Sequence, residues 1–311
     1  MTQQEEDVGI DVSKSDLDIG YWPEGEKLNF PNDRQGWGEV VKCLGRRKVR
    51  SIGLEASGGY ERGLLKALLD AGLPARRVNP LRVRQFAKAC GIMAKNDRID
   101  AVVIARFVAM VPQRAVERNP AAEAMAELVT ARRQICEELT RAQNQAEHAC
   151  QTIVKRLAKR RIDRLKAEIL LLDKALVQAV EADDQLAHKN ALLRSVPGVG
   201  PVYAHTLLGL MPELGTLTNR QAGSLLGVAP FDCESGAYKG QRRIFGGREA
   251  VRDVAYMAAL AASKYNPVLK AFQQRLRDAG KRPKVIIVAI MRKLITILNA
   301  ILRDNQPWAH S

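Results

Sequence analysis

The sequence has few cysteines, and their arrangement excludes two kinds of stabilised fold. The five cysteines are scattered, odd in number and include no CxxC pair. Disulfide frameworks and structural zinc sites need cysteines in sets, so neither is expected, and a reducing compartment fits. The opening stretch MTQQEEDVGI is acidic and lacks the basic and apolar regions of a signal peptide. We therefore expect a cytoplasmic protein.

Long apolar runs are also scarce. The one extended run, Val285 to Leu302, carries Arg292 and Lys293 near its centre. Two charges at that depth favour a packed helix, and no membrane association is expected. The sequence contains no GxxxxGK, and GVGPVY at 198–203 lacks the third glycine of a dinucleotide fingerprint. Nucleotide phosphate loops are therefore not supported.

Positive charge, in contrast, is abundant. The 311 residues include 49 Lys and Arg against 34 Asp and Glu, which gives a formal charge of +15 and an isoelectric point of about 9.8. Such an excess is typical of polyanion binders, so nucleic acid is the first partner to consider.

The segment from Lys155 to Lys166 holds seven bases and one acid. This density favours phosphate contact, with pairing to a partner helix as the alternative; the candidate residues are Lys155, Arg156, Lys159, Arg160 and Arg161.

The first part of the chain alternates strand and helix patterns. Three β-rich runs joined by short turns predict strands over 8–14, 17–22 and 27–30. Helices over 33–44 and 59–71 and strands over 49–55 and 75–79 follow. This order predicts an α/β sandwich with a mixed sheet, as in ribonuclease H-like folds.

The remainder is helical in pattern. From about 119 to 190, apolar residues alternate by three and four, which predicts a long helix or an antiparallel helical hairpin that acts as a spacer or dimerisation element. The stretch LLRSVPGVGPVYAHTLLGL then indicates a helix-hairpin-helix. There, Gly198 and Gly200 would let backbone N–H groups approach a DNA phosphate, although a tight turn without a ligand gives the same pattern.

Four acids are candidate metal ligands. Asp11 lies in the first predicted strand, Glu55 ends another, and Asp97 and Asp100 are three residues apart, on one face of a helix. A buried strand Asp is costly to leave unpaired, and Mg²⁺ prefers such oxygen ligands. Convergence of the four would make a two-metal site for phosphoryl transfer. The alternative is that they are a helix cap and separate surface acids that never converge.

One glycine-rich loop suits nucleophilic chemistry. FDCESGAYKGQRRIFGGREAVR surrounds Ser235 with glycines and bases. Cationic donors stabilise charge on phosphoryl oxygens during attack by a hydroxyl, although Ser-Gly in a loop is commonly only a turn. The basic candidates are Lys239, Arg242, Arg243 and Arg248.

Together these motifs resemble a known family: insertion-sequence transposases with an N-terminal RuvC-like DEDD domain and a C-terminal serine domain, which include Piv-type DNA invertases and bridge-RNA-guided recombinases. The matching stretches run from residue 8 to about 303. They are GIDVSK, GLEASGGYE, VNPLRVRQFAKACG, KNDRIDA, SVPGVGP, GVAPFDCESG and GGREAVR.

The resemblance implies residue roles and partners. Asp11, Glu55, Asp97 and Asp100 would hold Mg²⁺, and Ser235 would form a phosphoserine with cut DNA. It implies a structured guide RNA that selects target and donor DNA, a homodimer joined through the long helices, a tetramer on DNA, and a site composed from two protomers. The expected domains are a RuvC-like DEDD catalytic domain over 1–115, a helical coiled-coil linker over 116–190, and a helical domain over 191–311 with the helix-hairpin-helix and the serine.

Three other interpretations stay open at this point. A RuvC-like, structure-selective nuclease would need the acids and not Ser235. An actin-like sugar kinase or ATPase would use GIDVSKSDLDIGYW as a phosphate hairpin, but no second such hairpin follows. A non-catalytic DNA-binding protein would use only the basic helices and the helix-hairpin-helix.

Overall fold

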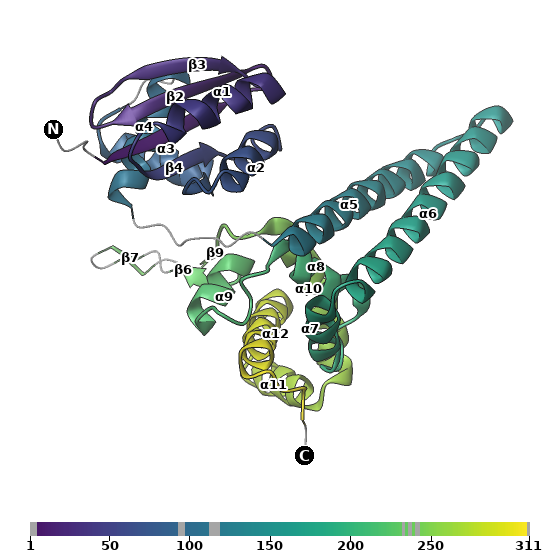
Figure 1. The fold of residues 1–311 in the computed structure, drawn as a ribbon. Coiled ribbons are helices and arrows are strands. Elements are labelled where there is room, and N and C mark those ends of the chain that lie inside the picture. Colours follow the sequence, from purple (N-terminus) through teal and green to yellow (C-terminus); the bar gives the residue numbers. More distant parts are fainter. Residues whose placement is uncertain are drawn as a thin grey trace. The chain divides into compact units, whose positions relative to one another are not determined.

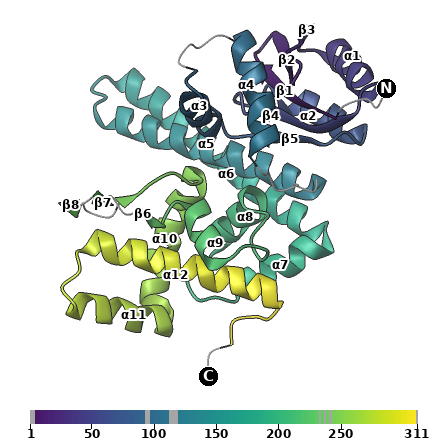
Figure 2. The same cartoon turned by 90° about the vertical axis from the view of Figure 1, so that its left-hand side faces the viewer.

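The computed structural model describes residues 5–92, 97–111, 119–231, 234–235, 238–239 and 243–309, with the backbone alone at 97–99, 231, 234–235 and 238–239. The chain forms two compact units, Met1–Arg118 and Asn119–Ser311 (Figures 1 and 2). The helical segment expected as a separate linker belongs to the second unit. The three-part division stays a prediction.

The first unit is a five-stranded mixed sheet with helices on both faces. The sheet order is β3-β2-β1-β4-β5, with β1 antiparallel to β2 and parallel to β4. This confirms the expected mixed sheet and is consistent with a ribonuclease H-like fold. The elements are β1 Glu6–Val12, β2 Asp16–Trp22, β3 Lys27–Pro31, α1 Arg34–Gly45, β4 Val49–Glu55, α2 Arg62–Asp70, β5 Ala75–Val78, α3 Pro80–Ala89 and α4 Asp97–Met110.

Several element boundaries differ from the sequence-based expectation; β1, for example, covers Glu6–Val12 and not 8–14. β2 begins at Asp16, which was expected in the turn, because Ser13 closes that turn: its Oγ accepts from the Asp16 N–H at 2.8 Å and its N–H donates to the Asp16 carbonyl at 2.9 Å. α2 begins at Arg62 and not at Gly59, since Gly58 and Gly59 have positive φ angles of 69° and 111° that no helix continues.

The two faces of the sheet bury different clusters. Val8, Ile10 and Val12 alternate along β1 and pack on the face covered by α1 and α2, together with Leu44 and Leu64. The other face is covered by α4, with α3 packed against it. Asp7, Gly9 and Asp11 point to this second face because they fall on the alternate positions of β1.

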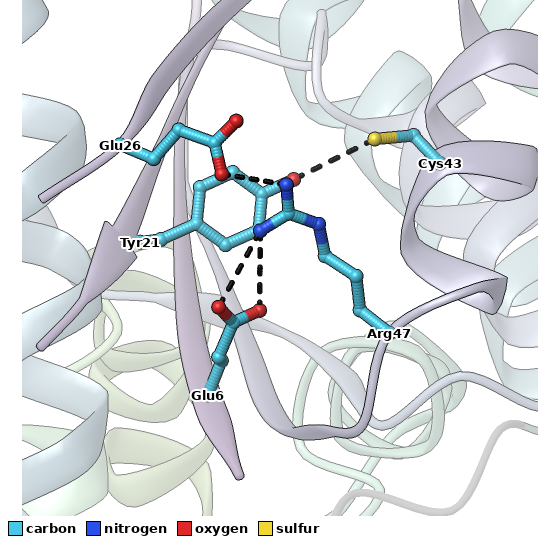
Figure 3. Close-up of polar contacts among 5 residues, drawn as sticks. All are labelled: Glu6, Tyr21, Glu26, Cys43 and Arg47. Atoms are coloured by element: carbon cyan, nitrogen blue, oxygen red, sulfur yellow. Dashed lines mark hydrogen bonds and ion pairs between the residues drawn. The ribbon is translucent and has the colours of Figure 1, made fainter. Parts of the chain in front are cut away.

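A group of polar contacts joins α1 to the end of the sheet where β1 begins (Figure 3). The Arg47 guanidinium donates to both Glu6 carboxylate oxygens at 3.4 Å and to Glu26 at 2.5 Å, and lies 4.2 Å from the centroid of the Tyr21 ring. The Tyr21 hydroxyl contacts the Cys43 sulfur at 3.7 Å. Burial raises the pKa of Tyr21, so the phenol stays protonated. These contacts hold the helix to the sheet, far along β1 from Asp11.

The second unit is mostly helical. Its first two helices, α5 Pro120–Glu147 and α6 Thr152–Glu181, run side by side as a long hairpin (Figure 1), which is the second of the two arrangements predicted for this segment. The other elements are α7 Asp184–Arg194, α8 Pro201–Leu210, α9 Asn219–Leu226, β6 Pro230–Phe231, β7 Glu234–Ser235, β8 Tyr238–Lys239, β9 Arg243–Ile244, α10 Glu249–Tyr265, α11 Pro267–Asp278 and α12 Pro283–Asp304.

α12 is the apolar run identified in the sequence. By length and composition it is the one described helix that could cross a membrane, and half of its most apolar stretch is buried inside the protein. Leu294 and Leu298 are fully buried in the core of the unit. The buried Asn299 amide donates to the Leu217 carbonyl at 2.7 Å and accepts from the Gly215 N–H at 2.9 Å. These contacts are those of a core helix, as expected.

Candidate catalytic site

Three glycines lie side by side across the sheet and let α4 approach it closely. Gly9 of β1 pairs with Gly20 of β2 and with Gly53 of β4. A Cβ atom at Gly9 would lie 2.1 Å from the Ala101 carbonyl oxygen, and one at Gly20 would lie 2.6 Å from the Val102 nitrogen. Both distances are far below van der Waals contact. The glycine row therefore seats α4 with its backbone against the strands.

The direction of α4 follows from its contacts. Ala101 crosses β1 at Gly9. Five residues later, the Arg106 guanidinium lies 5.1 Å from the centroid of Trp22, which pairs with Asp7 at the opposite end of β1 from Asp11. A Cβ atom at Gly53 of β4 would lie 2.6 Å from the Val108 Cγ1, so α4 crosses the sheet along the glycine row, from Ala101 at Gly20 and Gly9 to Val108 at Gly53.

Asp11 and Glu55 lie next to each other on parallel strands. Ile10 pairs with Leu54, and Asp11 and Glu55 are the next residues of β1 and β4. Asp11 shares the α4 face with Gly9, two residues before it. Asp11, Glu55 and Asp100 are all partly buried. The strand register therefore places two of the four predicted acids next to each other, and convergence of all four stays a prediction.

The fourth predicted acid lies on α4, like Asp100. Asp97 is the first residue of α4, and its side chain lies outside the described part of the chain. Among the described side chains, no three from Asp, Glu, His and Cys gather closely enough to hold a metal ion. Asp11, Glu55 and Asp100 thus do not make a closed site by themselves. Their carboxylates are nevertheless the donor type that a hard divalent cation prefers.

The loop after Glu55 is held by a buried acid that the sequence reasoning did not single out. Glu61 is 2% exposed and accepts from the backbone N–H groups of Ser57 at 3.1 Å and Gly59 at 2.9 Å, and from Arg77 at 3.2 Å. Burial acts to raise the pKa of Glu61, but these hydrogen bonds outweigh it and lower the pKa below its usual value. An ionised Glu61 therefore fixes the chain where it leaves β4.

The serine loop is described only in part. Ser235 ends β7, which pairs with β8 through Ser235 and Tyr238, and its side chain is among those not described. Arg242 and the Lys239 side chain also lie outside the described part. Arg243 is exposed on β9, which pairs with β6. The arrangement of cations around Ser235 stays a prediction.

Arg248 has a different surrounding from the one predicted. Its guanidinium donates to both Glu213 carboxylate oxygens, at 2.8 and 2.6 Å, and to the Leu210 carbonyl at 2.6 Å. Its backbone N–H donates to the Leu225 carbonyl at 2.8 Å. A bidentate pair of this kind occupies the donors that a phosphate would need. Arg248 anchors the end of the serine loop to the turn after α8, and its contact with nucleic acid stays a prediction.

In the predicted helix-hairpin-helix region, α7 and α8 are joined by residues 195–200. Gly198 has a φ of +97°, and a Cβ atom there would lie 2.4 Å from the Ala262 Cα of α10. The close packing against α10 is therefore sufficient to require glycine at position 198, and no bound phosphate is needed to account for it. Gly200 is exposed and caps α8, where N–H groups point outward. Phosphate contact at this turn stays a prediction that rests on Gly200.

The basic segment of α6 is a solvent-facing surface. Lys155, Arg156, Lys159, Arg160 and Arg161 are all exposed. They lie in the part of α6 that follows the α5–α6 connection. Five exposed cations within seven positions give a positive potential that suits a phosphate backbone.

A mixed sheet that carries carboxylates at one end, followed by helices with exposed cations, defines a phosphoryl-transfer enzyme that acts on nucleic acid. Comparison with known proteins identifies the family of enzymes to which the chain belongs. A family model for the DEDD domain of IS110 elements, described as a transposase, matches residues 8–154, and the transposase IS116/IS110/IS902 family matches residues 190–274. The chain belongs to the IS110 family of transposases.

Relatives of known name agree with this assignment. The chain is 28% identical to the pilin gene-inverting proteins of Moraxella bovis and Moraxella lacunata over 317 aligned residues, which cover 97% of each chain. It is 29% identical over 174 residues to an uncharacterised 42 kDa protein of insertion element IS900 from Mycobacterium paratuberculosis, covering 52% of this chain and 42% of that protein. The chain is thus a transposase of the phosphoryl-transfer class, and DEDD nucleases typically use a divalent metal.

Proposed function

We propose that this transposase cuts and rejoins DNA through a covalent phosphoserine at Ser235, with Mg²⁺ held by Asp11, Glu55, Asp97 and Asp100. The observation that carries the proposal is the placement of Asp11 beside Glu55 on the sheet face that α4, the helix of Asp100, covers. Oxygen ligands from two strands and one helix end are the donor set that Mg²⁺ prefers. The bound metal would stabilise charge on the phosphoryl oxygens and lower the pKa of an attacking hydroxyl.

Ser235 supplies the nucleophile in this proposal. Its Oγ attacks a DNA phosphorus, a Ser–O–P bond forms, and the bond from phosphorus to one sugar oxygen breaks. The serine proton passes to solvent and the departing sugar oxygen gains a proton, so that it leaves as a hydroxyl. Attack of another strand's hydroxyl on the phosphoserine reverses these changes. The phosphodiester is thereby conserved for rejoining, which hydrolysis would not achieve.

The decisive experiment is trapping of covalent protein–DNA adducts on the junction DNA of the element. The native chain and Ser235→Ala are compared with Mg²⁺ and with EDTA, with and without RNA transcribed from the non-coding flank. We expect an Mg²⁺-dependent adduct with the native chain and none with Ser235→Ala, because alanine has no oxygen to attack. Ser224→Ala, which removes a hydroxyl from α9, is the matched control. Strand cleavage by Ser235→Ala without an adduct would identify a nuclease instead.

We also propose that the transposase binds DNA, a guide RNA and further copies of itself. The names of the Moraxella relatives support DNA inversion as one outcome of the reaction. The exposed basic surface of α6 supports contact with DNA and with a guide RNA that selects target and donor ends. Leu170 and Leu171 on α6 are 63% and 65% exposed, and exposed apolar side chains on the hairpin support a homodimer formed through it. A tetramer on DNA is proposed from the family resemblance alone. The cytoplasm is the compartment we propose for this reaction.

The α6 surface gives a prediction that can be measured by salt dependence. Replacing Arg156, Lys159 and Arg160 together by glutamine should weaken DNA binding and reduce the slope of log K against log salt by up to about 3, because each lost phosphate contact removes about 1. The control replaces three exposed bases at the other end of the unit, Lys270, Arg277 and Lys281. An unchanged slope with a lost oligomer would favour the partner-helix alternative.

A further inference from the structure

Given the proposed function, in which Asp11 and Glu55 take part in the reaction, we infer that α3 binds the backbone of the DNA strand to be cut. Arg82 and Lys88 contact phosphates of that strand. The α6 surface and the serine loop belong to the second unit, so α3 gives the first unit a phosphate contact of its own.

The chain around α3 carries charge of one sign. Residues 71–92 contain five bases and no acid. Two of these bases lie on β5, where Arg77 donates to the buried Glu61 at 3.2 Å and Arg76 is partly buried. Arg82 and Lys88 are the exposed bases of α3, so their charges face solvent. Exposed cations without intervening acids suit the phosphate backbone of a nucleic acid.

The first turn of α3 lies at the same end of the sheet as the two acids. β4 and β5 are parallel, and Glu55 pairs with Val78, the last residue of β5. α3 begins two residues later at Pro80, directly after its N-cap Asn79. Ligands of open α/β sheets bind outside the carboxyl ends of parallel strands, which is where β1, β4 and β5 all end.

The exposed side of α3 presents both cations. Positions 81, 82, 85, 88 and 89 are exposed and form one side of the helix, with Arg82 and Lys88 at its two edges. Val83 and Ala87 are buried on the opposite side, in the cluster shared with α4. A rise of 1.5 Å per residue separates the two cations by about 9 Å along the axis, so they reach different phosphates.

The two acids make such cations necessary. A DNA strand that approaches Asp11 and Glu55 brings its phosphates toward like charges, which repel it. Cations beside the acids offset this repulsion, and the release of counterions from the contacted phosphates adds to binding. The helices on the other face of the sheet mix bases with acids, since α1 contains Glu39 and α2 ends at Asp70. α3 is therefore better suited to DNA than α1 or α2.

The first test measures DNA binding by the full chain in EDTA, without metal-dependent cleavage, over a series of salt concentrations. For the double variant Arg82→Gln, Lys88→Gln we expect weaker binding and a slope of log K against log salt reduced by about 2, because each lost phosphate contact removes about 1. Arg82→Lys keeps the charge and should keep the native slope. The control Lys42→Gln, Arg46→Gln removes one exposed lysine and one exposed arginine at the end of α1 and should also keep it.

The second test locates the contacted phosphates. Single phosphates of the junction DNA are replaced by uncharged methylphosphonates, one position at a time, and binding is compared between the native chain and the double variant. The native chain should lose affinity where a phosphate next to the cut is replaced. The double variant should show no further loss at these positions, because the cations that contact them are already absent. A general loss of structure would instead lower the affinity for every oligonucleotide to the same extent.

A native slope and a native methylphosphonate profile in the double variant would overturn the role of α3. Weaker binding of RNA transcribed from the non-coding flank, with unchanged binding of DNA, would also overturn it, since α3 would then bind the guide RNA. Neither test involves strand cleavage. Either can therefore fail while the phosphoserine adduct forms, and the adduct can fail to form while α3 still binds DNA.

Discussion

Asp11→Asn should lower DNA strand cleavage by about 1,000-fold or more, since loss of one ligand that supports a metal-stabilised transition state is worth about 4 kcal/mol. Asp11 lies on β1, next to Glu55 on the neighbouring strand β4. Asparagine is the same size and keeps one oxygen, so the strand and its pairing are expected to persist. The measurement is the single-turnover rate of cleavage on junction DNA at saturating Mg²⁺.

Binding of DNA by the same variant provides the control. The proposed phosphate contacts lie on α6, on α3 and in the serine loop, and the substitution leaves all of these segments unchanged. We therefore expect the dissociation constant for DNA to change by less than about twofold, well under the 1.4 kcal/mol of a tenfold change. A gel-shift loss as large as the loss of activity would instead identify Asp11 as a structural residue.

Much of the fold of the first unit follows from local sequence. Strands appear where β-branched residues alternate, and α1 begins after its N-cap Asp33, whose carboxylate accepts from the Gly36 N–H. The order of strands and helices then limits the sheet to few topologies. The acids Asp11 and Glu55 were found because each lies inside or at the end of an apolar strand, where a carboxylate is out of place.

Contacts between residues far apart in the chain could not be predicted from local sequence. Arg248 was assigned to phosphate because it lies in a basic loop, and its carboxylate partner Glu213 is 35 residues away. Glu61 is similar, since its partner Arg77 is 16 residues away. In each case the distance between the two residues along the sequence does not indicate that they pair, because the pairing depends on tertiary packing.

The glycine row gives the largest predicted effect on stability. Gly9→Ala should destabilise the first unit by about 3 kcal/mol, at the upper end of the range for overpacking. The added Cβ atom would lie 2.1 Å from the Ala101 carbonyl oxygen and 2.3 Å from the Ala105 nitrogen. Both are backbone atoms, so no side-chain rotation relieves the clash and α4 must move away from β1.

The control for this variant is Gly38→Ala. Gly38 lies within α1, and a Cβ atom there would meet no other atom within 4 Å. Alanine at an open helix position is favoured over glycine by up to about 1 kcal/mol, so the control should be slightly stabilised. Calorimetry of the full chain measures both changes, and hydrogen exchange of the β1 and α4 amides locates them.

A shift of α4 also has a consequence for the metal. Asp100 immediately precedes the residue that rests on Gly9, so a displacement of the helix by the width of a methyl group moves that carboxylate relative to Asp11. Gly9→Ala should therefore weaken Mg²⁺ binding although it removes no charge and no ligand. Lower stability with native Mg²⁺ affinity would show that the glycines seat the helix without positioning its acids.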